Sequence, residues 1–235
     1  MTPPADAMPA DVSLARRYRR FSGARLAWIA ALALALAAGF VLDVATGPSA
    51  FAFGDVVAGL LRPDVLPIDQ RVILWEVRLP QAVMALLVGA ALGLAGAEMQ
   101  TALNNPLASP FTLGVSAAAA VGASVAIVGG LALPAFGENL AVPLGAFAGA
   151  AGATLLVQLL ARRYGASVDT VVLFGIALLF CFEALLWLLQ YVADSDSLQQ
   201  IVFWTMGSLA RAAWNKIAIV AAVLALEGYT VLRAY

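Results

Sequence analysis

Apolar blocks recur along the chain, and polar residues, prolines and glycines separate one block from the next. A helix that crosses a bilayer needs about 20 apolar residues, which is close to the length of each block. The pattern therefore predicts an all-α polytopic membrane protein with about six transmembrane helices. The expected spans are 26–42, 80–103, 110–133, 142–160, 170–191 and 213–232. A short amphipathic helix is expected at 54–61.

Basic residues indicate how the spans are oriented. The polar tail 1–25 ends in RRYRRFSGAR, so the positive-inside rule places the N-terminus in the cytoplasm. The membrane domain is then expected to cover 26–235. Counting spans from there puts segment 47–78 outside, ARRYG (161–165) inside and ADSDSLQQ (193–200) outside. The alternative is a signal peptide cleaved near AFA (50–52), but the first apolar run exceeds the usual 7 to 15 residues.

Composition excludes a soluble domain and several kinds of chemistry. The chain is 63% hydrophobic and 11% charged, with a mean hydropathy of +0.94, whereas about a quarter of a soluble domain is charged. It has no His, and its single Cys181 lies in an apolar block, so we expect no disulfide and no metal site. No phosphate-binding G-x-x-x-x-G-K-[ST] loop is present. We therefore expect no catalytic residue, no bound cofactor and no nucleic-acid partner.

The second expected span is rich in small residues. Gly89, Gly93, Gly96 and Gln100 follow helical spacing and share one face, with Glu98 on the opposite side. Small residues let neighbouring backbones approach closely, so the three glycines are predicted helix-packing residues and the helix is expected to be enclosed by protein. The alternative is a uniform bias toward Ala and Gly, but the span at 170–191 has a single Gly.

The second span ends in a polar break. A residue before proline is disfavoured in the helical conformation and proline has no N–H, so Asn105 and Pro106 predict a helix end near Leu103. Ser109 and Pro110 are suited to be the N-cap and first turn of the next helix. The segment NNPLAS (104–109) is therefore expected to be a tight turn at the cytoplasmic boundary.

The segment RLPQAVMALLVGAALGLAGAEMQTALNNPLASPFTLGVSAAAAVG resembles the hallmark segment of the permease subunits of ABC importers for iron–siderophores, haem and cobalamin, the FecCD-type family. LFGIAL (173–178) and WTMGSLARAAW (204–214) resemble two later family segments, so the resemblance covers roughly 26–235.

The resemblance implies a ten-helix permease in the bacterial inner membrane. It also implies three partners: a second permease subunit, identical or paralogous, a periplasmic or lipid-anchored substrate-binding protein, and cytoplasmic ATPases that use ATP. This chain would correspond to the first part of that fold, without the coupling segment and the last four helices, and is expected to be truncated.

The resemblance also implies roles for individual residues. Arg78 matches the first arginine of an R-L-P-R segment that docks on the binding protein, and Gln81 replaces the second arginine. The alternative for Arg78 is an anchor at the end of a span. A second set is implied to shape the cytoplasmic half of the pathway and its gate: Gln100, Asn105, Pro106, Leu107, Ser109, Pro110 and Gly114.

Glu98, Glu183 and Glu227 lie within expected spans, where a charge is costly and usually faces a protein interior or water. Glu98, two residues from Gln100, is the best candidate for the pathway among them. The leading hypothesis is an importer permease for an iron chelate or related metal-organic cofactor that works by alternating access. The alternatives are a non-transporting permease fragment or membrane interaction protein, and an ion-coupled secondary transporter.

Overall fold

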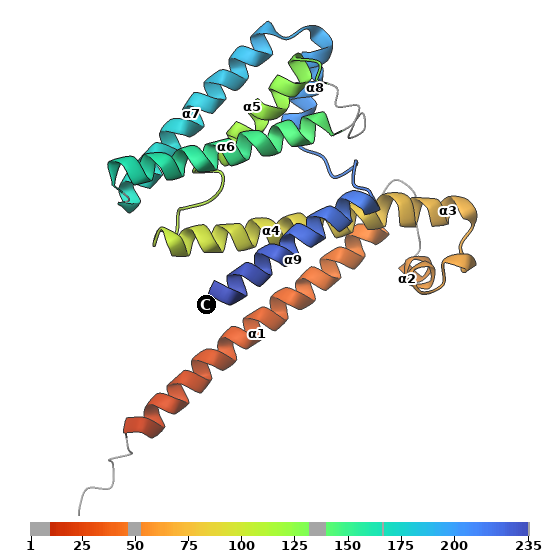
Figure 1. Ribbon diagram of the computed structural model, residues 1–235. Helices are drawn as coiled ribbons and strands as arrows, with labels where there is room; N and C mark the ends of the chain where they lie inside the picture. Colours follow the sequence, from red (N-terminus) through yellow and green to blue (C-terminus); the bar gives the residue numbers. More distant parts are fainter. Residues whose placement is uncertain (1–9, 47–52, 132–139, 166, 235) are drawn as a thin grey trace, which may run out of the picture. The chain divides into compact units, whose positions relative to one another are not determined.

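The computed structural model describes residues 10–46, 53–131, 140–165 and 167–234, and every regular element in them is helical (Figure 1). Two compact units divide the chain, Met1–Ala82 and Val83–Tyr235. The elements are α1 (Ala10–Ala45), α2 (Phe53–Leu61), η1 (Pro63–Val65), α3 (Ile68–Val72), η2 (Ile73–Arg78), α4 (Leu79–Ala102), α5 (Val115–Val128), α6 (Ala141–Tyr164), α7 (Val168–Val192), α8 (Ser195–Met206) and α9 (Trp214–Ala234).

Five helical runs in the described ranges are long and apolar enough to cross a membrane. They are Ser22–Ala45, Ile68–Ala102, Ala141–Tyr164, Val168–Val192 and Trp214–Arg233. The remaining expected span, the third at 110–133, corresponds to α5, an apolar helix of 14 residues. The predicted all-α polytopic membrane fold is confirmed, with five full-length helices and one shorter apolar helix.

The first unit contains a long apolar helix and a small packed module. Along α1, apolar side chains such as Trp28 and Leu34 are exposed, which is typical of a surface that faces lipid. Residues 53–78, from α2 to η2, enclose a core of Val56, Leu66 and Leu74.

Two features hold α2 against η2. The indole Nε1 of Trp75 donates a hydrogen bond of 3.2 Å to the carbonyl of Gly59. A Cβ at Gly59 would collide with Leu66, so the absence of a side chain there lets the turn after α2 close over the core. Residues 53–78 therefore form a folded module, and the expected short helix at 54–61 is confirmed as α2.

The second span begins earlier than its predicted start near residue 80. Helical structure runs from Ile68 and includes a π-helical segment, η2, directly ahead of Pro80. There the Leu79 N–H bonds to the carbonyl of Leu74, five residues back instead of four. Pro80 has no N–H to continue the α-helical pattern, and the wider turn before it lets the helix pass through the proline.

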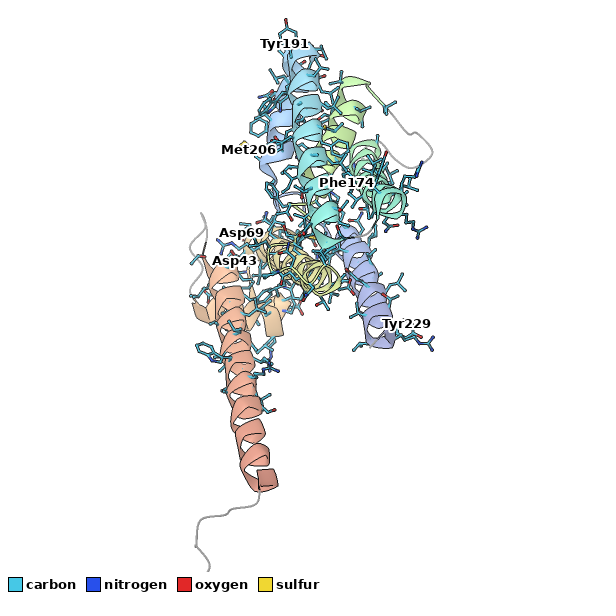
Figure 2. The ribbon with its side chains drawn as sticks, turned by 90° about the vertical axis from the view of Figure 1, so that its left-hand side faces the viewer. Asp43, Asp69, Phe174, Tyr191, Met206 and Tyr229 are labelled. Carbon is cyan, nitrogen blue, oxygen red and sulfur yellow. The ribbon has the colours of Figure 1, made fainter. Side chains whose placement is uncertain are left out.

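In the second unit, α5 is the central helix. It contacts α6, α7 and α8, and α6 also contacts α7 (Figure 1). The outer faces of the helices around it are apolar and open. Figure 2 shows Tyr191, Met206 and Tyr229 projecting away from α7, α8 and α9, and these side chains are 86%, 75% and 54% exposed. The helices α5 to α8 are therefore packed around α5, and the unit carries exposed apolar side chains as in a bilayer-embedded bundle.

Glycines bring the backbones of α5 and α6 into direct contact. A Cβ built on Gly122 or Gly149 would overlap backbone atoms of the facing helix, and one on Gly145 would lie 2.6 Å from the Gly122 carbonyl oxygen. Ala118 and Gly122 are four residues apart on α5, and so are Gly145 and Gly149 on α6. This is the small-residue packing used between membrane helices.

Two local features differ from what the sequence indicated. The third span was expected from residue 110, but α5 begins at Val115, because Gly114 takes a left-handed backbone with φ of +73° and interrupts the helix. The predicted residues 132 and 133 at its other end lie outside the described part. No helix was predicted in the polar stretch 193–200, yet Asp194 caps α8, which begins at Ser195.

Candidate functional site

The polar break after α4 forms a structured helix end with its own hydrogen bonds. Asn104 takes a left-handed backbone with φ of +43°. The Asn104 N–H bonds to the Thr101 carbonyl and the Asn105 N–H to the Gln100 carbonyl. These two bonds form a Schellman motif, which satisfies carbonyls left open in the last turn of a helix, and asparagine tolerates the left-handed position. The predicted helix end near Leu103 is confirmed.

Asn105 closes the following turn. Its side-chain Oδ1 accepts a hydrogen bond of 2.9 Å from the Leu107 N–H, and its carbonyl accepts one from Ala108. This is the Asx-turn geometry that asparagine forms before proline. Ala108 is buried, whereas the Leu107 side chain is 78% exposed. The expected tight turn at 104–109 is therefore confirmed, with Leu107 at its surface.

Ser109 caps a single turn that is separate from α5. Its hydroxyl oxygen accepts from the Thr112 N–H at 3.2 Å, as an N-cap would. The Thr112 hydroxyl in turn donates to the Ser109 carbonyl. Gly114 then reverses the sign of φ before α5 starts. The expectation that Pro110 begins the third helix was wrong, although the predicted capping role of Ser109 is realised on this turn.

Gly114 also packs this turn against α7. A Cβ there would lie 2.9 Å from the backbone nitrogen of Leu179. On the facing helix, a Cβ at Gly175 would lie 2.9 Å from the Cα of Leu113. Both positions need glycine for close approach, and Gly114 also needs it for its positive φ. The connection from α4 to α5 is thereby fixed on α7.

The last turn of α4 is anchored on the same bundle. Leu113, Val157 and Val171 form a buried cluster contributed by the connection, α6 and α7. Met99 of α4 and Leu103, the residue directly after α4, pack against it. These contacts place one side of the end of α4 against apolar residues and leave its small-residue side open.

The open side of α4 borders a hollow of about 530 Å³. Its walls come from two segments, the C-terminal half of α4 and the stretch from Ser109 to the first turn of α5. The lining residues are Leu92, Gly93, Gly96, Ala97, Gln100, Ser109, Pro110, Phe111 and Ser116. The hollow is mostly apolar, and the Gln100 amide and the Ser109 and Ser116 hydroxyls are its polar groups. Such a lining suits a bulky, largely apolar solute held by a few hydrogen bonds.

The structure brings only some of the predicted pathway residues to this hollow. Gln100, Ser109 and Pro110 line it, together with Gly93 and Gly96 from the predicted packing face. The others lie elsewhere: Glu98 on another side of α4, Asn105, Pro106 and Leu107 in the turn, and Gly114 against α7. Their roles in the pathway remain predictions. Glu183 of α7 and Glu227 of α9 are half-buried.

The predicted packing glycines of α4 make no close approach in the described part of the chain. A Cβ at Gly89, Gly93 or Gly96 would meet nothing within 4 Å. Their role as a contact face remains a prediction. The backbone contacts that do occur use Gly122, Gly145 and Gly149. In the sequence, the segment GAFAG (145–149), with two glycines four residues apart, is typical of such a backbone contact.

Arg78 lies in the first unit and is 7% exposed. Its Nη1 donates to the carbonyls of Val44 at 3.0 Å and Ala45 at 3.2 Å, at the C-terminal end of α1. A guanidinium there satisfies open carbonyls and lies at the negative end of the helix dipole. This is the geometry of a span-end anchor, and docking by Arg78 and the half-buried Gln81 remains a prediction.

Phe111 and Ser116 were not predicted. Phe111 is 61% exposed in an apolar stretch, and Ser116 is the second residue of α5, so neither departs from an ordinary span. Only the break in the helix at Gly114 brings them to the same hollow as Gln100. The sequence held no signal for that break beyond the glycine itself.

Comparison with known proteins gives consistent results. The sequence matches the FecCD transport family over residues 34–234. An ABC transporter permease protein of Methanocaldococcus jannaschii is 39% identical over 163 residues, which are 66% of this chain and 47% of that protein. The vitamin B12 import system permease protein BtuC of Shigella boydii is 33% identical over 207 residues, covering 87% of this chain and 58% of BtuC.

A solved structure is also similar. It is described as an inward-facing conformation of a metal-chelate type ABC transporter, and it aligns with a TM-score of 0.65 and 32% identity. The match covers 83% of this chain and 58% of the solved chain. The chain thus spans about half the length of the relatives it matches. The family match covers most of the chain, with all three segments that suggested the resemblance, and the chain belongs to the FecCD transport family.

Proposed function

We propose that the chain is a transmembrane subunit of a binding-protein-dependent ABC importer in the bacterial inner membrane. Its cargo would be an iron chelate or a related metal-organic cofactor, moved by alternating access. A second permease subunit, cytoplasmic ATPases and an external substrate-binding protein would complete the assembly.

One observation carries this proposal: the family match over residues 34–234 includes a polar helix end that is folded beside an apolar hollow. Gln100 and Ser109 offer hydrogen bonds there, while Gly93 and Gly96 leave room. The similar proteins named for vitamin B12 import and metal-chelate transport support a bulky chelate as cargo.

ATP-dependent uptake tests the proposal. The chain is expressed with the ATPase and binding-protein genes of its locus, purified, and reconstituted in proteoliposomes. Uptake of labelled ferric siderophore, haem and cobalamin is then measured with and without enclosed ATP. We expect uptake of one of these chelates that requires ATP and the binding protein.

Each contrary result favours a different alternative. Uptake that depends on an ion gradient and not on ATP indicates a secondary transporter, and would draw attention to Glu98, Glu183 and Glu227. A chain that is folded but takes up none of the chelates, with the ATPase bound or unbound, indicates a non-transporting fragment or membrane interaction protein.

A further inference from the structure

The hollow beside the end of α4 has an uncharged lining. Its polar residues are Gln100, Ser109 and Ser116, and the others are glycines and larger apolar residues. The Ser109 hydroxyl is already bonded to Thr112, whereas Gln100 and Ser116 are exposed. An amide and a hydroxyl can each donate and accept hydrogen bonds. A solute in the hollow therefore meets apolar walls and two exposed neutral polar groups.

The ionisable residues of the second unit differ in sign according to their position along the helices. Those away from helix ends are acids: Glu98 lies one turn before the end of α4, and Glu183 and Glu227 lie further inside α7 and α9. In the described part of this unit, the basic residues all lie at helix ends or between helices, and all are exposed: Arg162, Arg163, Arg211, Lys216 and Arg233. Between its ends, this unit therefore offers a solute neutral dipoles and carboxyl groups.

A negatively charged solute is poorly matched to such surroundings. An anion that leaves bulk water loses its hydration, and it needs cations or several hydrogen-bond donors in exchange. Proteins usually supply arginine or lysine for this purpose. Here the exposed donors are one amide and one hydroxyl, and Glu98, two positions before Gln100, is an acid. The hollow therefore favours a solute without net negative charge.

This distinction divides metal chelates into two groups. Hydroxamates are monoanions, so three of them neutralise Fe³⁺ in a ferric trihydroxamate. Catecholates bind as dianions, so three of them leave a ferric triscatecholate strongly anionic. A corrinoid with amide side chains belongs with the first group, and haem, which carries two carboxylates, belongs with the second. The neutral chelates present carbonyl oxygens and amide groups, which an amide and a hydroxyl can bond.

We propose that this hollow binds metal chelates without net negative charge, with the Gln100 amide and the Ser116 hydroxyl as their hydrogen-bonding partners. This inference rests on the proposed function and names the class of cargo within it, a neutral chelate such as a ferric trihydroxamate or a corrinoid. Leu92 and Phe111 supply apolar walls for the organic shell of the chelate, and the glycines of α4 leave room for it.

Opposite charges placed at Gln100 report the charge of the cargo. Gln100→Glu and Gln100→Lys are each assembled with the ATPase and the binding protein of the locus in proteoliposomes. ATP-dependent uptake is measured with saturating chelate-loaded binding protein, so that the binding protein's own preference does not enter the comparison. For a neutral chelate, both variants should lower the rate by a similar factor, about fivefold, because either charge retains water where the cargo should bind. An anionic cargo would instead pass Lys faster and Glu more slowly.

Thr101 provides a matched control. It is the next residue of α4, it is exposed, and it lies outside the lining of the hollow. Thr101→Glu and Thr101→Lys should leave the uptake rate unchanged. Ser116→Asp and Ser116→Lys form a second pair inside the hollow and should repeat the result if the Gln100 variants assemble poorly. The amount of ATPase that copurifies with each variant measures assembly.

A panel of four chelates applied to the unmodified chain completes the test: a ferric trihydroxamate, cobalamin, a ferric triscatecholate and haem. Uptake of one of the first two supports the proposal and distinguishes a hydroxamate from a corrinoid. Uptake of the triscatecholate or haem that Gln100→Lys accelerates overturns it, while the proposed function stands.

Two further results are informative. A neutral chelate whose uptake the Gln100 variants leave unchanged, or change in opposite directions, also overturns the proposal, because the hollow then does not bind a neutral cargo. If no chelate is taken up with ATP, the proposed function fails and this inference fails with it.

Discussion

Arg78 is buried beside the end of α1, where its Nη1 donates to two carbonyls from a position 33 and 34 residues later in the chain. Those carbonyls would otherwise lack partners at a helix end. The side chain therefore fixes the end of the first span to the π-helical segment that precedes Pro80. A docking arginine, in contrast, would keep its guanidinium exposed.

Arg78→Ala should lower the stability of the folded chain. It removes hydrogen bonds that involve a charged donor, which contribute about 1.5–3 kcal/mol each to stability. Thermal unfolding in detergent, followed by tryptophan fluorescence, measures the change, and Arg62→Ala at an exposed arginine of the same unit is the control. Unchanged unfolding together with weaker binding-protein affinity would instead support the docking role that the family resemblance implies.

At the scale of elements, the contact between α5 and α6 depends on glycine. Gly149→Ala should destabilise the bundle by about 1–3 kcal/mol, because its Cβ would overlap the Ala118 carbonyl and the helices would have to separate. Gly152→Ala, one turn further along α6, is a matched control, since its Cβ would meet nothing within 4 Å. The midpoint of thermal unfolding should be lower for Gly149→Ala than for Gly152→Ala. Equal midpoints would contradict this packing.

The start of α8 depends on an ionised cap. Asp194 accepts hydrogen bonds from the backbone N–H groups of Asp196 and Ser197 and from the Ser197 hydroxyl. Those from the Ser197 amide and hydroxyl are the main cause that holds the pKa of Asp194 below its ordinary value. A carboxyl with a lowered pKa in the folded state stabilises it above its unfolded pKa, near 4, and loses this effect as the pH falls through the lowered value.

Asp194→Ala should therefore destabilise α8 at pH 6, and the difference from the unmodified chain should shrink as the pH falls below about 4. Asp194→Asn keeps a capping oxygen that does not titrate and should lose less stability at pH 6. Thermal unfolding between pH 6 and pH 2.5 provides the comparison. A difference that stays constant over this range would show that the charge of the cap is not involved.

Helix boundaries were predictable where local chemistry decides them. Asn105 and Pro106 correctly indicated the end of α4, because the residue before a proline is disfavoured in the helical conformation and the Asn105 side chain can close a turn. The late start of α5 was missed, since Gly114 combines its positive φ with a close contact to Leu179 of α7, a residue 65 positions later in the chain. The start of α3 and the whole of α8 were missed because their polar residues were interpreted only as marks of segments outside the membrane.

The residues of the candidate site were only partly predictable from the sequence. Gln100, Ser109 and Pro110 of the motif line one hollow, whereas Gly114 has a packing contact and Glu98 lies on another side of α4. The pathway role of all five stays a prediction. The motif indicated which residue types recur in the family, and the folded turn determined which of them share a surface.

At the scale of the whole molecule, α5 is too short to cross a bilayer alone. Its 14 residues span about 21 Å, against a hydrocarbon core of about 30 Å. The capped turn at 109–112 and the Schellman turn at Gly130 extend it at each end. Backbone that is not helical must be shielded from lipid by protein where it lies inside the membrane. The packing of Gly114 on Leu179 supplies such cover, so this helix with its turns can serve as the third crossing.

The third crossing determines on which side of the membrane each later segment lies. We expect Asp169, at the start of α7, to lie inside and Asp196, at the start of α8, to lie outside. Asp169→Cys and Asp196→Cys are made separately in a Cys181→Ser background, and intact cells are treated with an impermeant maleimide. Only the Asp196→Cys variant should react, whereas reaction of both would show that α7 does not cross.

The glycine and alanine contact between α5 and α6 also has a consequence for folding. Gly and Ala have no side-chain rotamers to immobilise, so this contact forms without the conformational entropy loss that accompanies packing of larger side chains. The two helices are neighbours in the sequence, so they can pair as soon as both are inserted. The α5–α6 pair then offers a preformed surface on which α7 and α8, made later, can assemble.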